Sequence, residues 1–138
     1  MKVFADTSGI FALLVVNDSM HQHARLAFAD YSQHRAQLFT SSFVLVETTA
    51  LLQRRIGLSA IRDFNTRILP LCNIVWTDKE WYERAVQRLF LEGRKDLSLV
   101  DCLSFEIMES YDSPAAFAFD THFDEIGFST PHSDPNLT

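Results

Sequence analysis

The sequence has few of the residues that mark secreted, membrane-bound or low-complexity chains. Its only two cysteines, Cys72 and Cys102, stand in apolar stretches without the CxxC spacing of a metal or redox pair. We therefore expect two buried, reduced thiols and a cytoplasmic protein. The apolar run at residues 10–16 is short and has no small-residue cleavage site, so it does not resemble a signal peptide. No run approaches the ~20 apolar residues of a membrane span.

Positive charge is also scarce. Twelve Lys and Arg against eighteen Asp and Glu leave a formal charge of −6, which disfavours a general nucleic-acid coat protein, because such proteins carry basic surfaces. A nuclease is not excluded, because acidic residues that hold metal ions are neutralised by them. The sequence also lacks a P-loop, a GxGxxG turn and a GxSxG elbow, which excludes the common nucleotide-binding and serine-hydrolase motifs.

The residues that are present suit one globular domain. The 138 residues are 47% hydrophobic and include twelve phenylalanines, which predicts a core rich in aromatic rings. We expect the domain to span residues 1–129. Residues 130–138 hold two prolines among mostly polar neighbours and are expected to form a mobile tail.

Short apolar runs alternate with helical patterns along the chain. Strands are expected at residues 2–5, 37–40, 71–76 and 115–119, with a fifth at 127–129. Helices are expected at residues 8–14, 18–31, 42–55, 60–69, 78–92 and 99–110, with caps at Ser41 or Ser42, Ser59, Thr77 and Ser98. This alternation predicts an α/β fold, a three-layer sandwich in which helices cover both faces of a parallel sheet.

Two aspartates follow strands. Asp6 comes directly after the first strand and Asp120 after the fourth, and each is followed by a threonine, Thr7 or Thr121. Ligands of open α/β sheets bind outside the carboxyl ends of the strands. Either aspartate could simply cap the next helix. Together in one crevice, however, they would repel each other, and a bound cation would remove that cost.

Two further acids stand in apolar helices. Glu47 lies in a stretch of apolar and small residues, where an unpaired carboxylate is costly. Alternatively, Glu47 lies on an exposed helix edge or pairs with Arg54. Asp101 has a similar setting, and its alternative role is the acid of a capping box with Ser98.

The ligand types indicate which metal such a site would hold. Oxygen donors without a histidine or cysteine cluster favour Mg²⁺ or Mn²⁺ over zinc. Asp124 lies one helical turn after Asp120 and is a weaker candidate ligand. Asp96 is interpreted as a solvated loop residue. The histidines show no metal-ligand spacing, and His122 is notable only as a neighbour of Asp120.

Four segments carry a family resemblance. They are residues 3–8, Glu47 in its apolar helix, residues 96–105 and residues 118–123, and together they resemble the PIN-domain family from about Lys2 to Phe128. The resemblance implies a five-stranded parallel sheet and an acidic pocket of Asp6, Glu47, Asp101 and Asp120, with Asp124 as a fifth member. Many short members are toxins of toxin–antitoxin pairs, similar to VapC, that cut RNA. Members commonly form homodimers.

The resemblance suggests roles for individual residues. Asp6, Asp101 and Asp120 would hold the metal, directly or through water, and Glu47 would orient or deprotonate water or hold a second metal. Thr7 and Thr121 would hydrogen-bond the carboxylates. RNA phosphates could contact basic residues outside the site. Alternatively, these residues belong to solvated faces of helices. The candidates are Arg54, Arg55, Arg62, Arg67, Arg88, Arg94 and Lys95.

Other functions fit the sequence less well. A phosphoacceptor receiver would need a lysine near the later strands, and none follows Lys95. A phosphatase of the Asp-x-Asp kind would need an acid where Ser8 stands. A catalytically inactive PIN-like scaffold is disfavoured by the presence of all four principal acids.

Overall fold

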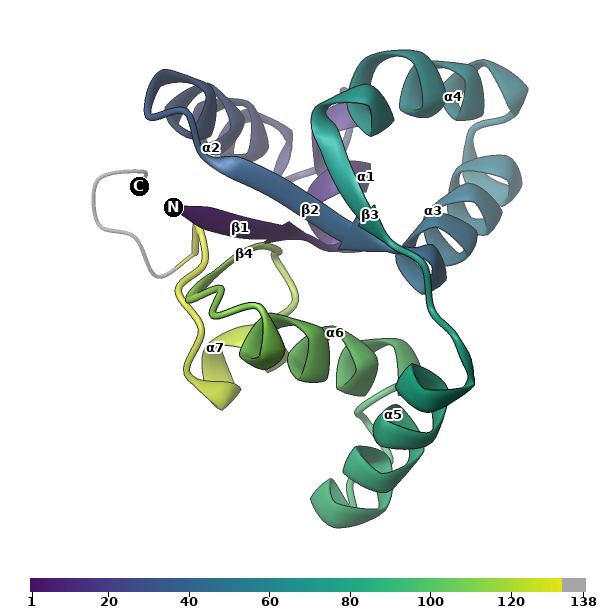
Figure 1. Ribbon diagram of the computed structural model, residues 1–138. Coiled ribbons are helices and arrows are strands. Elements are labelled where there is room, and N and C mark those ends of the chain that lie inside the picture. The colour runs from purple at the N-terminus through teal and green to yellow at the C-terminus, as the bar shows by residue number, and fades with distance from the viewer. Residues whose placement is uncertain (133–138) are drawn as a thin grey trace.

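A four-stranded parallel sheet of order β3-β2-β1-β4 forms the centre of the computed structural model, which describes residues 1–132 (Figure 1). The strands are β1 (Lys2–Ala5), β2 (Gln37–Ser41), β3 (Cys72–Val75) and β4 (Ala115–Phe117). All three residues from Val3 to Ala5 are buried, as expected for a central strand covered on both faces. The chain runs outward from β1 to β3 and then crosses to the other side of β1. The connections therefore change direction between β1 and β4, and ligands of open α/β sheets bind at such a point, outside the carboxyl ends of the strands.

Helices cover both faces of the sheet, which confirms the predicted α/β architecture. Figure 1 shows α1, α2 and α4 on one side and α5, α6 and α7 on the other. The helices are α1 (Thr7–Leu14), α2 (His21–Gln33), α3 (Ser42–Arg55), α4 (Leu58–Asp63), α5 (Lys79–Glu92), α6 (Leu99–Ser110) and α7 (Thr121–Ile126). Within residues 1–132, no helix is long and apolar enough to cross a membrane.

The prediction of five strands is wrong. Residues 127–129 approach β4 at one position only, where Ser129 forms an isolated parallel bridge with Ala115. The Ala116 N–H donates to the Ser129 carbonyl at 2.8 Å, and the Ser129 N–H donates to the Pro114 carbonyl at 2.9 Å. The next residue, Thr130, is buried and donates through Oγ1 to Asp124 at 2.7 Å, so the chain leaves the sheet edge after one bridge.

The structure describes the first residues of the predicted C-terminal tail. Thr130 and Pro131, which were expected to begin a mobile tail, are both buried. Residues 133–138, which make up most of that tail, lie outside the described residues.

Several predicted helix starts were misplaced by a few residues. Gly57, not Ser59, occupies the N-cap position of α4, with a φ of 129° that favours glycine. The helix continues through a π-helical turn (Phe64–Ile68), and Pro70 lies inside a short 3₁₀ helix (Leu69–Leu71). Asp78, not Thr77, caps α5 by accepting a hydrogen bond from the Trp81 backbone N–H at 3.0 Å. At α5 an adjacent residue with similar capping ability holds the position, whereas Gly57 makes no side-chain cap at α4.

Close packing brings the first helix against the last strand. A Cβ on Gly9 of α1 would lie 2.2 Å from the Phe117 carbonyl oxygen of β4. Only glycine permits this approach without displacing one of the two backbones. The Asp6 N–H, just before α1, donates to the same carbonyl at 3.1 Å. The end of β1 is therefore fixed beside the end of β4.

Phenylalanine rings fill the core, as the composition predicted. Phe4, Phe105 and Phe123 are fully buried. Phe105 of α6 and Phe123 of α7 meet edge to face with ring centroids 5.2 Å apart. This contact holds together the two helices at whose N-terminal ends Asp101 and Asp120 lie. Of the two thiols, Cys102 is buried and Cys72 is half-buried, and neither forms a disulfide.

Candidate active site

Asp6 caps the helix that follows the central strand. Its side chain is 4% exposed, and Oδ2 accepts hydrogen bonds from the Ser8 backbone N–H at 3.1 Å and the Ser8 hydroxyl at 2.6 Å. Burial raises the pKa of Asp6 to about 7, although the two bonds from Ser8 lower it. The nearby charges of Asp101 and Glu47 also contribute to this rise of the pKa. Asp6 is thus both a helix cap and one of a group of interacting acids.

The Ser8 hydroxyl also connects the two central strand ends. Besides donating to Asp6, Ser8 Oγ accepts a hydrogen bond from the Phe119 backbone N–H at 3.0 Å. Sequence reasoning assigned Ser8 no role at the site. A serine two residues after a capping aspartate was the available signal, because Oγ in the first helical turn can reach the capping carboxylate.

Asp101 lies at the start of α6 and has the capping role that the sequence offered as its alternative. The capping box is present, because the Asp101 N–H donates to Ser98 Oγ at 3.0 Å and the Ser98 N–H donates to Asp101 Oδ2 at 3.3 Å. The residue is 8% exposed, and burial together with the charge of Asp120 raises the pKa of its carboxyl. The capping role therefore does not remove Asp101 from the acidic group.

Asp120 is the N-cap residue of α7. Its Oδ1 accepts from the His122 backbone N–H at 3.0 Å. Strand β4 ends at Phe117, two residues earlier than predicted, so Ala118 and Phe119 form a short connection between β4 and Asp120.

Glu47 projects from the middle of α3. It is half-buried, and among the described ion pairs none joins it to Arg54. Burial raises the pKa of Glu47, a hydrogen bond with the Thr7 side chain lowers it, and the charges of Asp101 and Asp120 raise it again. Thr7 itself is held by the buried Thr48, with their hydroxyl oxygens 2.9 Å apart. The alternative of an isolated, solvated Glu47 is not what the structure has.

The four acids suit a hard cation. Asp6, Glu47 and Asp101 each have a raised pKa with burial as its largest cause and a neighbouring carboxylate among the others. In each of the three aspartates, one carboxylate oxygen accepts all the described hydrogen bonds: Oδ2 of Asp6, Oδ2 of Asp101 and Oδ1 of Asp120. The other oxygen of each remains available as a ligand. A divalent cation would offset the repulsion between the neighbouring carboxylates, and carboxylate oxygens are the ligands that Mg²⁺ and Mn²⁺ prefer.

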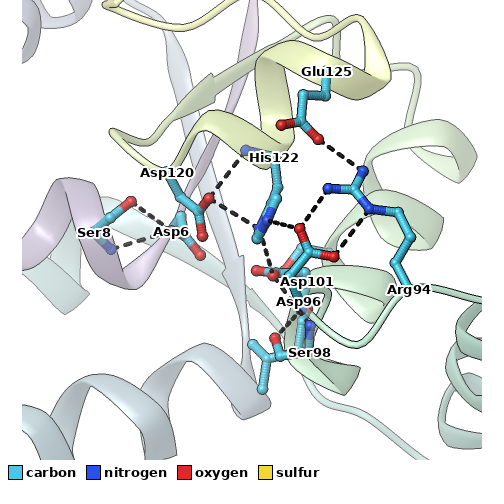
Figure 2. A network of polar contacts seen from close by, with 11 residues as sticks. Asp6, Ser8, Arg94, Asp96, Ser98, Asp101, Asp120, His122 and Glu125 are labelled. Atoms are coloured by element: carbon cyan, nitrogen blue, oxygen red, sulfur yellow. Dashed lines mark hydrogen bonds and ion pairs between the residues drawn. The ribbon is translucent and has the colours of Figure 1, made fainter.

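His122 joins the acids more closely than the sequence indicated. Its Nδ1 lies 3.0 Å from Asp120 Oδ1 and 3.3 Å from Asp101 Oδ2. Its Nε2 lies 3.3 Å from Asp96 Oδ2 (Figure 2). Burial alone would lower the pKa of His122, but the charges of Asp120 and Asp101 outweigh it, and the pKa is raised. One atom each from Asp101, Asp120 and His122 lies within 4.8 Å of the other two, a spacing that could hold a metal ion.

Asp96 is an organised part of this network, not an isolated loop residue. Its two oxygens accept hydrogen bonds from Arg94 at 2.6 and 3.0 Å. Arg94 also donates to Glu125 of α7 at 2.7 Å, which ties the loop before α6 to α7 (Figure 2). The sequence did not indicate this series of contacts, because Arg94 and Glu125 are 31 positions apart.

The remaining candidates are less involved. The Thr121 side chain is exposed and takes part in none of the described hydrogen bonds, so its predicted contact with a carboxylate has no support. Asp124 accepts from Thr130 and is absent from the group of three potential ligands. Of the basic candidates, Arg88 and Arg94 are held in ion pairs, while Arg55 lies over the Phe11 ring at 5.8 Å.

Comparisons with known proteins show which family and which proteins this chain resembles. Residues 3–129 match the model of the PIN domain family. The chain is 31% identical over 127 residues to the 23S rRNA-specific endonuclease VapC20 of two Mycobacterium tuberculosis strains, covering 91% of this chain and 95% of the relative. The crystal structure of Mycobacterium tuberculosis VapC20, described as a Sarcin-Ricin loop cleaving toxin, superposes with a TM-score of 0.82 at 30% identity. That alignment covers 91% of this chain and 95% of the other.

Proposed function

Because the chain belongs to the PIN-domain family and is a VapC-like protein, we propose that it is a metal-dependent endoribonuclease and the toxin of a toxin–antitoxin pair. One observation carries the proposal. Carboxylates from four separated segments, Asp6, Glu47, Asp101 and Asp120, interact at the carboxyl ends of the central strands. Burial and the charges of neighbouring acids raise the pKa values of Asp6, Glu47 and Asp101. A purely structural cluster would not be expected to concentrate buried, mutually repelling acids in the ligand crevice of an α/β sheet.

Asp6, Asp101 and Asp120 are proposed to hold Mg²⁺ or Mn²⁺, directly or through water. When bound, such an ion lowers the pKa of coordinated water and offsets negative charge on the phosphate. Glu47 is proposed to orient the attacking water or accept its proton, with Thr7 holding the carboxylate in place. Ser8 and Ser98 fix the rotamers of Asp6 and Asp101 through the hydrogen bonds described above. These contacts set the geometry before substrate arrives.

RNA is the proposed substrate because the relatives act on RNA. The first RNA to test is a hairpin with the sarcin–ricin loop sequence of 23S rRNA, since the similar toxin is named for cleaving it. An antitoxin is the proposed protein partner on the same grounds. A homodimer stays a prediction. The apolar helical segments at residues 43–52 and 56–71 could offer its surface, since Val46 of α3 is 71% exposed and Leu58 of α4 is 69% exposed.

The test is cleavage of this hairpin and of a mixed single-stranded RNA pool by the purified protein, with Mg²⁺, Mn²⁺ or a chelator. We expect cleavage only with metal, and Asp101→Asn should lower the rate more than about a hundredfold, because even residues that merely support a metal ligand cost 10–100-fold.

The matched control is Asp112→Asn at the opposite end of α6. Asp112 is exposed and has a φ of 53°, a left-handed conformation that asparagine also tolerates. This variant should cleave like the wild type. Cleavage in chelator, or full activity of Asp101→Asn, would contradict the proposal. Intact RNA in all samples with no metal bound would favour the inactive scaffold.

A further inference from the structure

His122 has the position of a nitrogen ligand in an otherwise acidic site. Its Nδ1 faces Asp120 Oδ1 at 3.0 Å and Asp101 Oδ2 at 3.3 Å, so one ring nitrogen lies between the two carboxylates (Figure 2). The side chain is 16% exposed. It lies in the first turn of α7, two residues after Asp120, and the Asp120 carboxylate accepts the His122 backbone N–H. Backbone and ring are therefore both anchored at the site.

The other ring nitrogen has the partner that a metal-binding histidine requires. Nε2 lies 3.3 Å from Asp96 Oδ2. When Nε2–H donates to Asp96, the lone pair of the neutral ring is on Nδ1, facing the carboxylates. Histidines that bind metals in proteins almost always donate their second N–H to a carboxylate, carbonyl or water, which fixes the tautomer and ring orientation.

Asp96 is itself held in place. Arg94 donates to both of its oxygens, at 2.6 and 3.0 Å, and a further Arg94 nitrogen donates to Glu125 at 2.7 Å. Glu125 and His122 both belong to α7, so the chain of contacts closes on the helix that carries the ring. An incidental contact between a surface histidine and an acid would not need this support.

Building on the proposed function, we propose that His122 Nδ1 is a direct metal ligand beside carboxylate oxygens of Asp101 and Asp120, and that the site therefore prefers Mn²⁺ to Mg²⁺. The three ligand atoms lie within 4.8 Å of one another, a spacing that one ion can bridge. Mg²⁺ binds oxygen ligands and retains its waters, whereas imidazole binds later divalent metals more readily. Mn²⁺ accepts both donor types.

The direct test is electron spin-echo envelope modulation of Mn²⁺ bound to the purified wild-type protein. A histidine nitrogen bonded to Mn²⁺ gives a ¹⁴N modulation that a carboxylate and water shell does not give. We expect ¹⁴N modulation in the wild type and none in His122→Asn. The matched control is His34→Asn, whose ring is 66% exposed and, within the part of the chain that the structure describes, contacts Asp30 of its own helix. It should keep the modulation.

Metal affinity provides a second measurement. Mn²⁺ titrations should show at least a tenfold weaker affinity for His122→Asn and about a tenfold weaker affinity for Asp96→Ala, which removes the acid that orients the ring. Mg²⁺ affinity should change much less in both variants. Circular dichroism of each variant checks that the fold is retained, and the wild-type spectrum tests the proposal without any substitution.

The outcomes separate this inference from the function on which it rests. Bound Mn²⁺ without ¹⁴N modulation in the wild type, or with modulation that persists in His122→Asn, overturns the role of His122 and leaves the acidic nuclease site standing. A wild-type protein that binds Mg²⁺ but no Mn²⁺ also overturns the role of His122, and one that binds neither ion overturns both proposals.

Discussion

At the scale of single residues, the environment of Asp6 disfavours a negative charge. Its carboxyl group is almost fully buried beside Asp101 and Glu47, and its pKa is raised to about 7, first by burial. The unfolded chain has no such burial, and its Asp6 would titrate near the ordinary value of 3.8. The folded protein therefore retains a proton that the unfolded chain has already lost over this pH range.

This difference predicts how stability depends on pH. The contribution of protonated Asp6 is fully present below pH 3.8 and is lost as pH rises through about 7. At about 1.4 kcal/mol for each pKa unit, the loss is a few kcal/mol at most. Urea unfolding of the metal-free protein should show stability falling from pH 5 to pH 8. Asp6→Asn should flatten the curve and be more stable than the wild type at pH 8.

Asp112→Asn is the control for this experiment, because it removes an exposed acid and should leave the curve unchanged. Parallel curves for the wild type and Asp6→Asn would show that Asp6 is already ionised in the folded protein. Saturating Mn²⁺ should oppose the fall in the wild type, because a bound cation favours the ionised carboxyl.

The principal acids could be predicted from the sequence, but most of their partners could not. Asp6 and Asp120 follow apolar strands, and Glu47 and Asp101 interrupt apolar helices, so local context marked all four. The Asp96–His122 contact depends on how a loop folds back on α7, across 26 positions of sequence. No local pattern encodes such a contact, and the site roles of all these residues stay predictions until variants are measured.

At the scale of elements, an ion network fastens α5 to the helix that carries Asp101. Arg88 of α5 donates to Glu106 and Glu109 of α6, with N–O distances of 3.0 Å to each, and to Glu92 at 3.1 Å. Only 14% of the Arg88 side chain and 17% of the Glu106 side chain are exposed. The guanidinium also lies 5.5 Å from the centroid of the Phe105 ring.

Removing the central cation should therefore loosen this helix pair. Arg88→Ala leaves Glu106 largely buried without its closest partner and should cost about 3 kcal/mol of unfolding free energy. Arg84→Ala is the matched control, because Arg84 contacts the same Glu106 at 3.3 Å but is 40% exposed. It should cost about 1 kcal/mol or less.

Urea unfolding of both variants measures the difference. Equal losses would mean that the buried network adds nothing beyond an exposed ion pair. RNA cleavage should fall in Arg88→Ala only to the extent that the folded fraction falls, since the Arg88 guanidinium is held in ion pairs with Glu92, Glu106 and Glu109.

The elements themselves were largely predictable, and their ends were not. Buried parallel strands read as continuous apolar runs, and the capping box of Ser98 and Asp101 is present as expected. The prediction of a fifth strand was wrong because strand pairing depends on the path of the residues that follow, and Thr130 turns toward Asp124. The start at Gly57 depends on a positive φ that the sequence alone could not reveal.

At the scale of the whole molecule, an acidic protein must still hold a polyanion. The formal charge is −6, and of the predicted phosphate contacts, Arg94 is already bound to Asp96 and Glu125. Arg54 and Arg55 lie in the last turn of α3, whose middle carries Glu47, and none of the described ion pairs includes them. We therefore expect these two to supply more of the RNA affinity than Arg94.

RNA binding should weaken steeply with salt. Each phosphate contact contributes about 0.7 to the slope of log affinity against log salt for a single strand. Arg54→Ala and Arg55→Ala should each reduce the slope by roughly that amount, while Lys79→Ala, 89% exposed on α5, should not. Fluorescence anisotropy in an Asp101→Asn background keeps the RNA intact. A slope unchanged by both arginine variants would remove them from the RNA footprint.

The central claim is that the four carboxylates form the metal-dependent catalytic site of a ribonuclease. Its most direct test is one Mn²⁺ titration in which bound Mn²⁺ and RNA cleavage are measured in the same samples. We predict that the cleavage rate rises in proportion to bound Mn²⁺, and that Asp6→Asn and Asp101→Asn lose both while Asp112→Asn keeps both. Cleavage that continues without bound Mn²⁺, or that survives in the two site variants, would contradict the claim.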